Sequence, residues 1–289
     1  VMATKGTWNQ ANIRKTNPMF SPFRVTIETP FYGNNVYPVT DIKEAYKMAK
    51  NSPGTIVTSL KVKDPERIGL ERDTHVLLFN DGTVFGRCAA ARRIFGQPGI
   101  EVPEFSTILR EAAYGTRYRR LYQAEALIGL DHDFMVRARL CVPERHENIL
   151  YNWLLNFQPI NDEYRQMYAQ SRVMEKEGDI LVFADPDWSD PRFPLGLSFF
   201  DPKANCAAIL GMRYFGEYKK GTLTLAWNIA NKNGYVSCHG GLKKYALKEK
   251  GAFVISFFGL SGSGKSTLTH AKHGGKYDIT ILHLSLIHI

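Results

Sequence analysis

The chain contains 289 residues, of which 44% are hydrophobic and 22% are charged, a balance typical of globular domains and not of disordered or fibrous chains. Its formal net charge of +9 fits a basic cleft for anionic small molecules, because Lys and Arg are spread along the chain and form no recognisable nucleic-acid-binding module. The four cysteines form no C-x-x-C pair, and neither a secretory signal nor a membrane-spanning stretch is visible. We therefore expect a cytoplasmic protein without disulfides, nucleic-acid partners or membrane contacts.

The first part of the chain alternates between irregular and regular patterns. Residues 1–37 are rich in Asn, Pro and Thr, and we expect them to be irregular. Residues 41–50 predict a short amphipathic helix with Asp41 as its N-cap. Residues 55–62 and 75–79 predict strands.

The middle of the chain has the pattern of an α/β domain with a mixed sheet. Residues 106–130 are predicted to be helical in part, and residues 217–229 fit either a strand or an amphipathic helix. A helix is expected over residues 144–157. Strands are expected over residues 134–142 and 179–184, with a hairpin formed by residues 195–200 and 207–214.

Residues 252–267 contain a strand-like run followed by a glycine loop, Lys265 and Ser266, the G-x-x-x-x-G-K-[ST] pattern in the context it requires. The glycines let several backbone N–H groups point into one concavity, and a helix starting near Lys265 adds its positive dipole end. Lys265 would reach the outer phosphates of a bound nucleotide, and the Ser266 hydroxyl would join the shell of a magnesium ion. The predicted phosphate-binding residues are Gly259, Leu260, Ser261, Gly262, Ser263, Gly264, Lys265, Ser266 and Thr267.

A composition shift near residues 231–234 predicts a domain boundary, so that residues 1–232 form one domain and residues 233–283 begin a second. Residues 276–283 read as a further strand, and residues 284–289 follow with no cap, turn or polar tail. A phosphate-loop domain needs more strands than one after its loop. We therefore expect the chain to be a fragment whose residues 284–289 are a non-native tail.

Two further motifs precede the loop: Tyr214-Phe215-Gly216-Glu217-Tyr218-Lys219-Lys220-Gly221 and Ser237-Cys238-His239. Together with residues 257–268, their order and spacing resemble ATP-dependent phosphoenolpyruvate carboxykinase. That family shows Tyr-x-Gly-Glu-x-Lys-Lys-Gly, Ser-x-His and Phe-Phe-Gly-Leu-Ser-Gly-x-Gly-Lys-[ST]-Thr-Leu. The resemblance covers most of the chain up to His283, where the family has paired aspartates and this chain has Leu284-Ser285.

The resemblance implies the fold of the family, a substrate-side N-terminal domain followed by a nucleotide-binding domain of the phosphoenolpyruvate carboxykinase type. It implies the gluconeogenic conversion of oxaloacetate and ATP to phosphoenolpyruvate, CO2 and ADP, with Mn2+ and Mg2+ as cofactors. By motif, Lys220 and His239 match the family's metal-binding residues and Lys265 its phosphate-binding lysine, which makes these three the candidate catalytic residues. Ser266 stands where the family usually has a metal-binding Thr, and Tyr214 matches a substrate-side tyrosine. The resemblance leaves the oligomeric state open.

Arg87 is the candidate for binding the substrate carboxylate, together with Tyr214 and Lys220. A planar guanidinium can hold both oxygens of a carboxylate at once. Arg87 follows Gly86 as in the family's Gly-Arg-Ser-Pro element, although residues 88–91 replace the Ser-Pro part.

Two other functions remain open: a generic P-loop kinase for a small molecule or protein, which needs neither Lys220 nor His239, and a fragment without catalytic activity. Other charged residues have simpler interpretations. Asp185 and Asp187 resemble an acidic metal loop but fit a surface turn better. The Arg92-Arg93 and Arg119-Arg120 pairs are expected to be surface charge, and His146 has no partner that the sequence identifies.

Overall fold

The computed structural model describes residues 21–79, 89–157, 159–172, 179–247, 251–259 and 262–288. They fall into two compact units, residues 1–226 (unit 1) and residues 227–289 (unit 2). The division lies inside helix α6 (Phe215–Lys232). The assignment of one domain to residues 1–232 and another to residues 233–283 stays a prediction.

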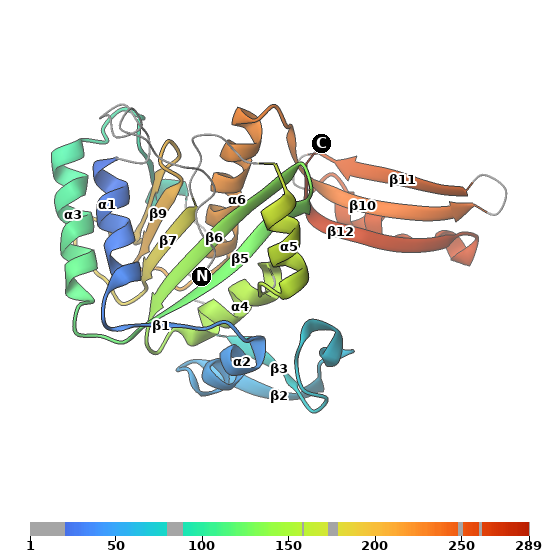
Figure 1. Cartoon of the computed structure of the whole chain (residues 1–289), viewed down its shortest axis with the longest axis horizontal. Helices are drawn as coiled ribbons and strands as arrows, with labels where there is room; N and C mark the ends of the chain where they lie inside the picture. Colours follow the sequence, from blue (N-terminus) through green and yellow to red (C-terminus); the bar gives the residue numbers. More distant parts are fainter. Residues whose placement is uncertain are drawn as a thin grey trace. The chain divides into compact units, whose positions relative to one another are not determined.

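Unit 1 is built around a seven-stranded mixed sheet with the order β1-β5-β6-β7-β9-β8-β4 (Figure 1). Four of its six pairings are parallel, and only β5–β6 and β8–β9 are antiparallel. The strands are β1 (Val36–Pro38), β4 (Arg92–Ile94), β5 (Leu121–Asp131), β6 (Phe134–Pro143), β7 (Ile180–Asp185), β8 (Leu197–Asp201) and β9 (Cys206–Leu210). The prediction of an α/β domain with a mixed sheet is confirmed.

Helices cover both faces of this sheet. Helices α1 (Pro22–Glu28), α3 (Val102–Gly115) and α5 (Asp162–Gln170) lie on one face, and α6 lies behind it in Figure 1. On the α1–α3 face, the rings of Phe23 and Phe199 pack 4.6 Å apart within the buried core. On the other face, Trp153 of α4 (Glu147–Phe157) donates a hydrogen bond from Nε1 to Thr222 Oγ1 of α6 at 3.0 Å.

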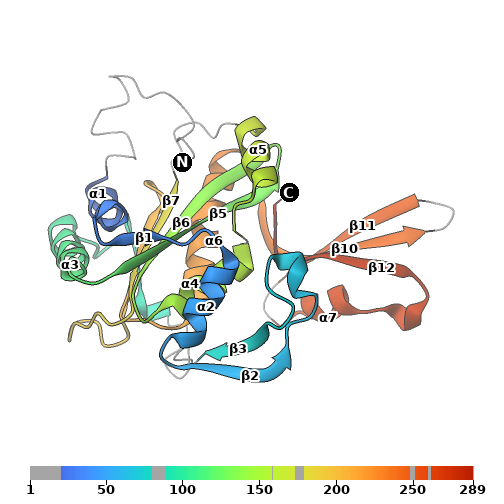
Figure 2. The same ribbon diagram turned by 60° about the horizontal axis from the view of Figure 1, so that its bottom comes forward.

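A smaller layer of unit 1 contains helix α2 (Ile42–Asn51) and the antiparallel hairpin of β2 (Thr55–Lys61) and β3 (His75–Phe79). Helix α2 packs on α4 and on β2 (Figure 2). The predicted N-cap is confirmed, because the Asp41 side chain accepts a hydrogen bond from the backbone N–H of Lys43 at 2.9 Å. Short 3₁₀ turns occur at Thr29–Tyr32, Pro65–Ile68 and Ala89–Ala91.

Unit 2 is a three-stranded antiparallel sheet with the order β11-β10-β12 and one short helix. Its elements are β10 (Ser237–Leu247), β11 (Gly251–Phe258), α7 (Lys265–His270), a 3₁₀ turn at His273–Gly275 and β12 (Asp278–His288). Strand β12 was expected to end at residue 283, but it continues in register with β10 as far as His288. Whether residues 284–289 are native stays a prediction.

Most of the strand predictions are confirmed, and residues 106–130 are helical in part as predicted, but the start of the chain and helix α5 differ from expectation. The prediction of irregular structure for residues 1–37 is wrong over residues 22–32 and 36–37, which form α1, a 3₁₀ turn and the start of β1. Ser21 caps α1 and accepts a hydrogen bond from the N–H of Phe23 at 3.1 Å. Within residues 106–130 the helix ends at Gly115 and β5 begins at Leu121, and α5 was not predicted. The ambiguous residues 217–229 are helical. None of the helices in the described ranges has the length and apolar character that crossing a membrane requires.

Candidate functional site

The motif from Tyr214 to Gly221 lies at the carboxyl end of β9 and forms the start of α6. Close packing explains why glycine is needed at both Gly216 and Gly221. A Cβ atom on Gly216 would lie 2.5 Å from the ring of Tyr214, so the half-buried tyrosine ring lies against the first turn of the helix. A Cβ atom on Gly221 would lie 3.1 Å from the ring of Phe200, so this glycine lets α6 approach β8 closely.

Glu217, in the first turn of α6, is completely buried and pairs with Arg92 of β4. Arg92 Nε lies 2.6 Å from Glu217 Oε1, and the guanidinium lies 5.4 Å from the centre of the Phe200 ring. The prediction that Arg92 is surface charge is therefore wrong. Removing one partner of such a buried pair is costly, so the pair ties the start of α6 to the edge of the sheet.

The two lysines of the motif are half-buried. Burial lowers the pKa of Lys219, the neighbour of the predicted metal ligand. Lys220 is the sixth residue of α6, and its backbone carbonyl accepts a hydrogen bond from Thr224 Oγ1 at 2.7 Å. The structure thus places Tyr214 directly before α6 and Lys220 within its first two turns, while Arg87 lies outside the described residues.

A network of four charged or titratable side chains lies at the carboxyl end of β7. Arg119 binds Asp185 Oδ1 at 2.8 Å and Asp187 Oδ2 at 2.7 Å, and Asp187 Oδ2 lies 2.9 Å from His146 Nε2. Among the residues that the structure describes, no three His, Cys, Asp or Glu side chains group as a metal site would require. Asp185 is buried at the end of β7, whereas Asp187 is exposed in the turn that follows, so the surface-turn prediction holds for Asp187 but not for Asp185. Arg119 pairs with both aspartates and is not free surface charge, and His146 does have a partner.

The environment of this network shifts two pKa values. Burial lowers the pKa of His146, although Asp187 pulls it in the opposite direction. Burial raises the pKa of Asp187, but the contact with His146 and the charge of Arg119 outweigh this, so the pKa lies below its usual value. At neutral pH the network therefore holds an ionised Asp187 beside an uncharged imidazole.

In unit 2 the glycine loop connects the end of β11 to the start of α7, the strand–loop–helix order that the sequence predicts. Gly262 and Gly264 have φ angles of +79° and +83°, a region that side chains other than glycine rarely adopt. Helix α7 starts at Lys265, with Ser266 and Thr267 exposed in its first turn. Leu260 and Ser261 lie outside the described residues, and the binding of phosphate by the whole loop stays a prediction.

His239 is exposed and is the third residue of β10. The next residue, Gly240, pairs with Phe258, the last residue of β11, so His239 and the beginning of the glycine loop lie at the same end of unit 2. A Cβ atom on Gly241 would lie 2.1 Å from Thr269 Oγ1, so the glycine allows β10 to pack directly on α7. An imidazole near this end and the exposed hydroxyl of Ser266 are ligand types that fit a divalent cation.

Lys243 is a residue that the sequence reasoning missed. Its side chain is completely buried, and Nζ donates hydrogen bonds to the backbone carbonyls of Leu268 at 2.9 Å and Ala271 at 2.5 Å. A lysine ammonium at the carboxyl end of a helix satisfies its last carbonyl groups and interacts favourably with the helix dipole. Lys243 therefore anchors the helix that follows the glycine loop, and nothing in the sequence distinguishes it from the adjacent Lys244.

Comparison with known proteins identifies what this chain resembles. Residues 91–275 match the family model described as phosphoenolpyruvate carboxykinase. The phosphoenolpyruvate carboxykinase (ATP) of Dictyostelium discoideum is 26% identical over 216 residues, which cover 68% of this chain and 36% of the relative. The glycosomal phosphoenolpyruvate carboxykinase (ATP) of Trypanosoma brucei brucei is 24% identical over 236 residues, 79% of this chain and 46% of the relative.

A third relative has a higher identity over a shorter stretch. The phosphoenolpyruvate carboxykinase (ATP) of Aeropyrum pernix is 38% identical over 100 residues, 33% of this chain and 19% of the relative. The matched region thus spans less than half the length of each of these three curated relatives.

Proposed function

The chain belongs to the phosphoenolpyruvate carboxykinase family, and we propose that the protein containing it converts oxaloacetate and ATP to phosphoenolpyruvate, CO2 and ADP, a step of gluconeogenesis. One observation carries the proposal: the family match over residues 91–275 includes all three motifs, at Tyr214–Gly221, Ser237–His239 and Gly259–Thr267. The preference for ATP over GTP rests on the names of the relatives.

The glycine loop is the proposed site of the nucleotide phosphates. The positive φ angles of Gly262 and Gly264 support it, because this conformation lets successive N–H groups point to one side. The ammonium of Lys265, at the start of α7, would neutralise the charge that develops on the transferred phosphoryl group. Lys243 would hold the far end of the same helix in place.

Tyr214, Lys220 and Arg87 are the proposed substrate-binding residues. Breaking the bond between the leaving carboxylate and the rest of oxaloacetate leaves an electron pair that forms an enolate. The enolate oxygen then attacks the γ-phosphorus in line, and ADP departs with the electron pair of the broken P–O bond. The protein's task is to hold the two reactants in line, which the packing of Tyr214 against the α6 start supports.

Lys220, His239 and Ser266 are the proposed ligands of Mn2+ and Mg2+. A bound divalent cation supplies positive charge that stabilises the enolate oxygen and the phosphoryl group. Lys220 can serve as a ligand only with a neutral amine, and its half-buried position at the start of α6 keeps it partly shielded from water. His239 would use one neutral ring nitrogen.

We propose that the substrates are small molecules, in agreement with the family, and that the enzyme works in the cytoplasm without nucleic-acid or membrane partners. The basic composition of the chain supports a preference for anionic substrates such as oxaloacetate and ATP.

The proposal is tested with the full-length product of the gene that encodes this chain. Oxaloacetate-dependent formation of phosphoenolpyruvate is measured with ATP, GTP or pyrophosphate as donor, in the presence of Mn2+ and Mg2+. We expect activity with ATP that needs a divalent cation. Activity only with another donor would contradict the assignment.

Two variants separate the proposed function from a generic P-loop kinase. Lys265→Ala should lower the rate by at least about 100-fold, and Lys272→Ala, at an exposed position after α7, is its control. His239→Ala should remove Mn2+-dependent activity while ATP binding persists, and exposed His132→Ala is its control. Full activity of His239→Ala would favour the generic kinase.

A further inference from the structure

A cavity of about 330 Å³ lies in unit 1 between the β1–α2 connection, strands β5 and β6, and the start of α5. Its walls include residues 38–40, Gln123, Glu125, Arg139, Ile160 and Arg165. This is the sheet face on which Leu127 and Met135 pack with Tyr168 of α5, whereas α6 with Tyr214 and Lys220 covers the other face. The cavity is therefore separate from the proposed substrate-binding residues at the start of α6.

Arg139 is the most informative residue in the wall, because it is only 7% exposed and lines the cavity. Its Nη2 donates to Gln123 Oε1 at 2.9 Å and its Nη1 to Tyr32 Oη at 3.2 Å, while Nε lies 3.3 Å from Glu125 Oε1. A guanidinium has five N–H donors, and the hydrogen bonds seen among the described residues use two of them. Buried donors require acceptors, so this side chain has capacity for a ligand oxygen.

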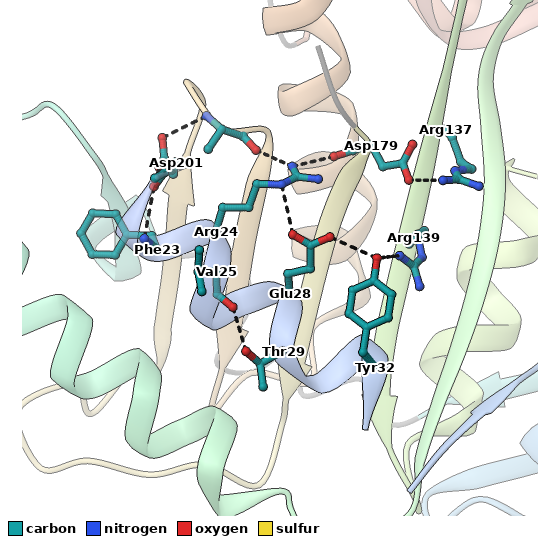
Figure 3. Close-up of polar contacts among 12 residues, drawn as sticks. Phe23, Arg24, Val25, Glu28, Thr29, Tyr32, Arg137, Arg139, Asp179 and Asp201 are labelled. Atoms are coloured by element: carbon teal, nitrogen blue, oxygen red, sulfur yellow. Dashed lines mark hydrogen bonds and ion pairs between the residues drawn. The ribbon is translucent and has the colours of Figure 1, made fainter. Parts of the chain in front are cut away.

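The position of Arg139 is fixed before any ligand arrives. The rings of Phe31 and Tyr32 lie 5.0 and 5.3 Å from its guanidinium carbon. Figure 3 shows how Tyr32 continues the network, since its hydroxyl donates to Glu28 Oε1 at 3.2 Å and Glu28 pairs with Arg24 at 3.5 Å. Such preorganisation lowers the entropic cost of binding.

The charge of the wall indicates the class of ligand. Arg139 and Arg165 contribute two positive charges and Glu125 one negative charge, which leaves a net charge of +1. Arg165 pairs with the fully exposed Asp162 at 3.8 Å, a distance and exposure at which an ion pair contributes little. A net charge of +1 matches the single charge of a monoanion. A phosphate dianion would carry excess negative charge and would be repelled more strongly by Glu125.

We propose that this cavity binds a small organic monocarboxylate. Its carboxylate would lie between Arg139 and Arg165, because arginine matches the geometry of a carboxylate. Its hydrocarbon part would contact Ile160 and the side chains of Pro38 and Val39. Small-molecule sites generally have this composition, with mostly apolar walls and a few polar groups that fix the orientation.

The test uses the whole chain, with acetate, butyrate and hexanoate as probes and methyl NMR signals of Ile160 and Val39 as the local readout. We expect saturable shifts of these signals at millimolar concentration, with affinity rising about fourfold for each added methylene that is buried. Inorganic phosphate should not shift the same signals. Absence of shifts with all three probes, equal affinity for all of them, or an equal response to phosphate would overturn the proposal.

Variants connect the binding to the cavity. Arg165→Gln should weaken binding about tenfold, whereas exposed Arg172→Gln, which makes the same charge change outside the cavity wall, should leave it unchanged. Thr40→Trp, which fills the cavity from its edge, should abolish binding. Tyr214→Phe should bind as the wild type does, which distinguishes this site from the proposed substrate site.

Arg139→Gln should also abolish binding, provided that its urea unfolding midpoint shows a folded protein. If that variant does not fold, Arg165→Gln and Thr40→Trp decide the question. Binding that survives both of them would show that the carboxylate lies elsewhere and would overturn the proposal.

Discussion

The ion pair between Arg137 of β6 and Asp179, which precedes β7, offers a quantitative test of the structure (Figure 3). The two residues are only 6% and 8% exposed. Burial by itself would lower the pKa of Arg137, but the hydrogen bond with Asp179 and its charge raise that pKa above the ordinary value. Asp179→Ala would remove the carboxylate that compensates this buried charge.

The expected cost follows from the burial of both partners. Breaking a buried pair by removing one charge destabilises a protein by about 3–5 kcal/mol, because the other charge stays in a region of low polarity. With a urea m-value of about 2–3 kcal/mol/M, the unfolding midpoint of unit 1 should fall by about 1–2.5 M. The double variant Arg137→Met/Asp179→Ala removes both charges and should be more stable than Asp179→Ala alone.

The assay is urea unfolding followed by tryptophan fluorescence, to which Trp153, completely buried in unit 1, contributes. Asp73→Ala is the control, because Asp73 pairs with Lys61 on the surface, where the two side chains are 86% and 63% exposed. Loss of this exposed pair should not change the midpoint measurably. Equal midpoints for Asp179→Ala and Asp73→Ala, or a double variant less stable than the single one, would contradict a buried Arg137–Asp179 pair.

Three further predictions concern other parts of the chain. Burial holds the folded-state pKa of His146 below its unfolded value of about 6.5, so the free energy of unfolding should decrease as the pH falls below about 6.5. Urea midpoints measured at pH 7.5 and pH 5 should differ less for His146→Asn than for the wild type. Lys243→Met leaves two carbonyl groups at the end of α7 without their donor, which should lower the free energy of unfolding by about 1–3 kcal/mol and speed hydrogen exchange in α7. Equal exchange in Lys243→Met and Lys244→Met would contradict the proposed anchor. Burial raises the pKa of Cys141 to about 12. Iodoacetamide at pH 8 should therefore label half-buried Cys238 in the folded protein but Cys141 only after unfolding. Rapid labelling of Cys141 in the folded protein would argue against its burial.

Local patterns predicted much of the fold. An alternating pattern predicted strand β6, an apolar run predicted β3, and Asp41 marked the start of α2, because strand patterns and helix capping depend on neighbours a few residues away. Helix α1 was not predicted, because its stability depends on packing that local sequence patterns do not show. Its residues Phe23 and Ile27 are buried against the sheet.

The sequence by itself determined the family and the order of the three motifs, including a glycine loop between a strand and a helix. Only the tertiary structure decided which charged residues are buried and paired. Arg92 finds Glu217 across 125 positions of the chain, and Arg119 finds Asp185 across 66. The order of strands in the sheet brings such partners together, and no local propensity encodes that order. The adjacent residues Lys243 and Lys244 are chemically identical, and only the packing of α7 on β10 makes the first a buried anchor.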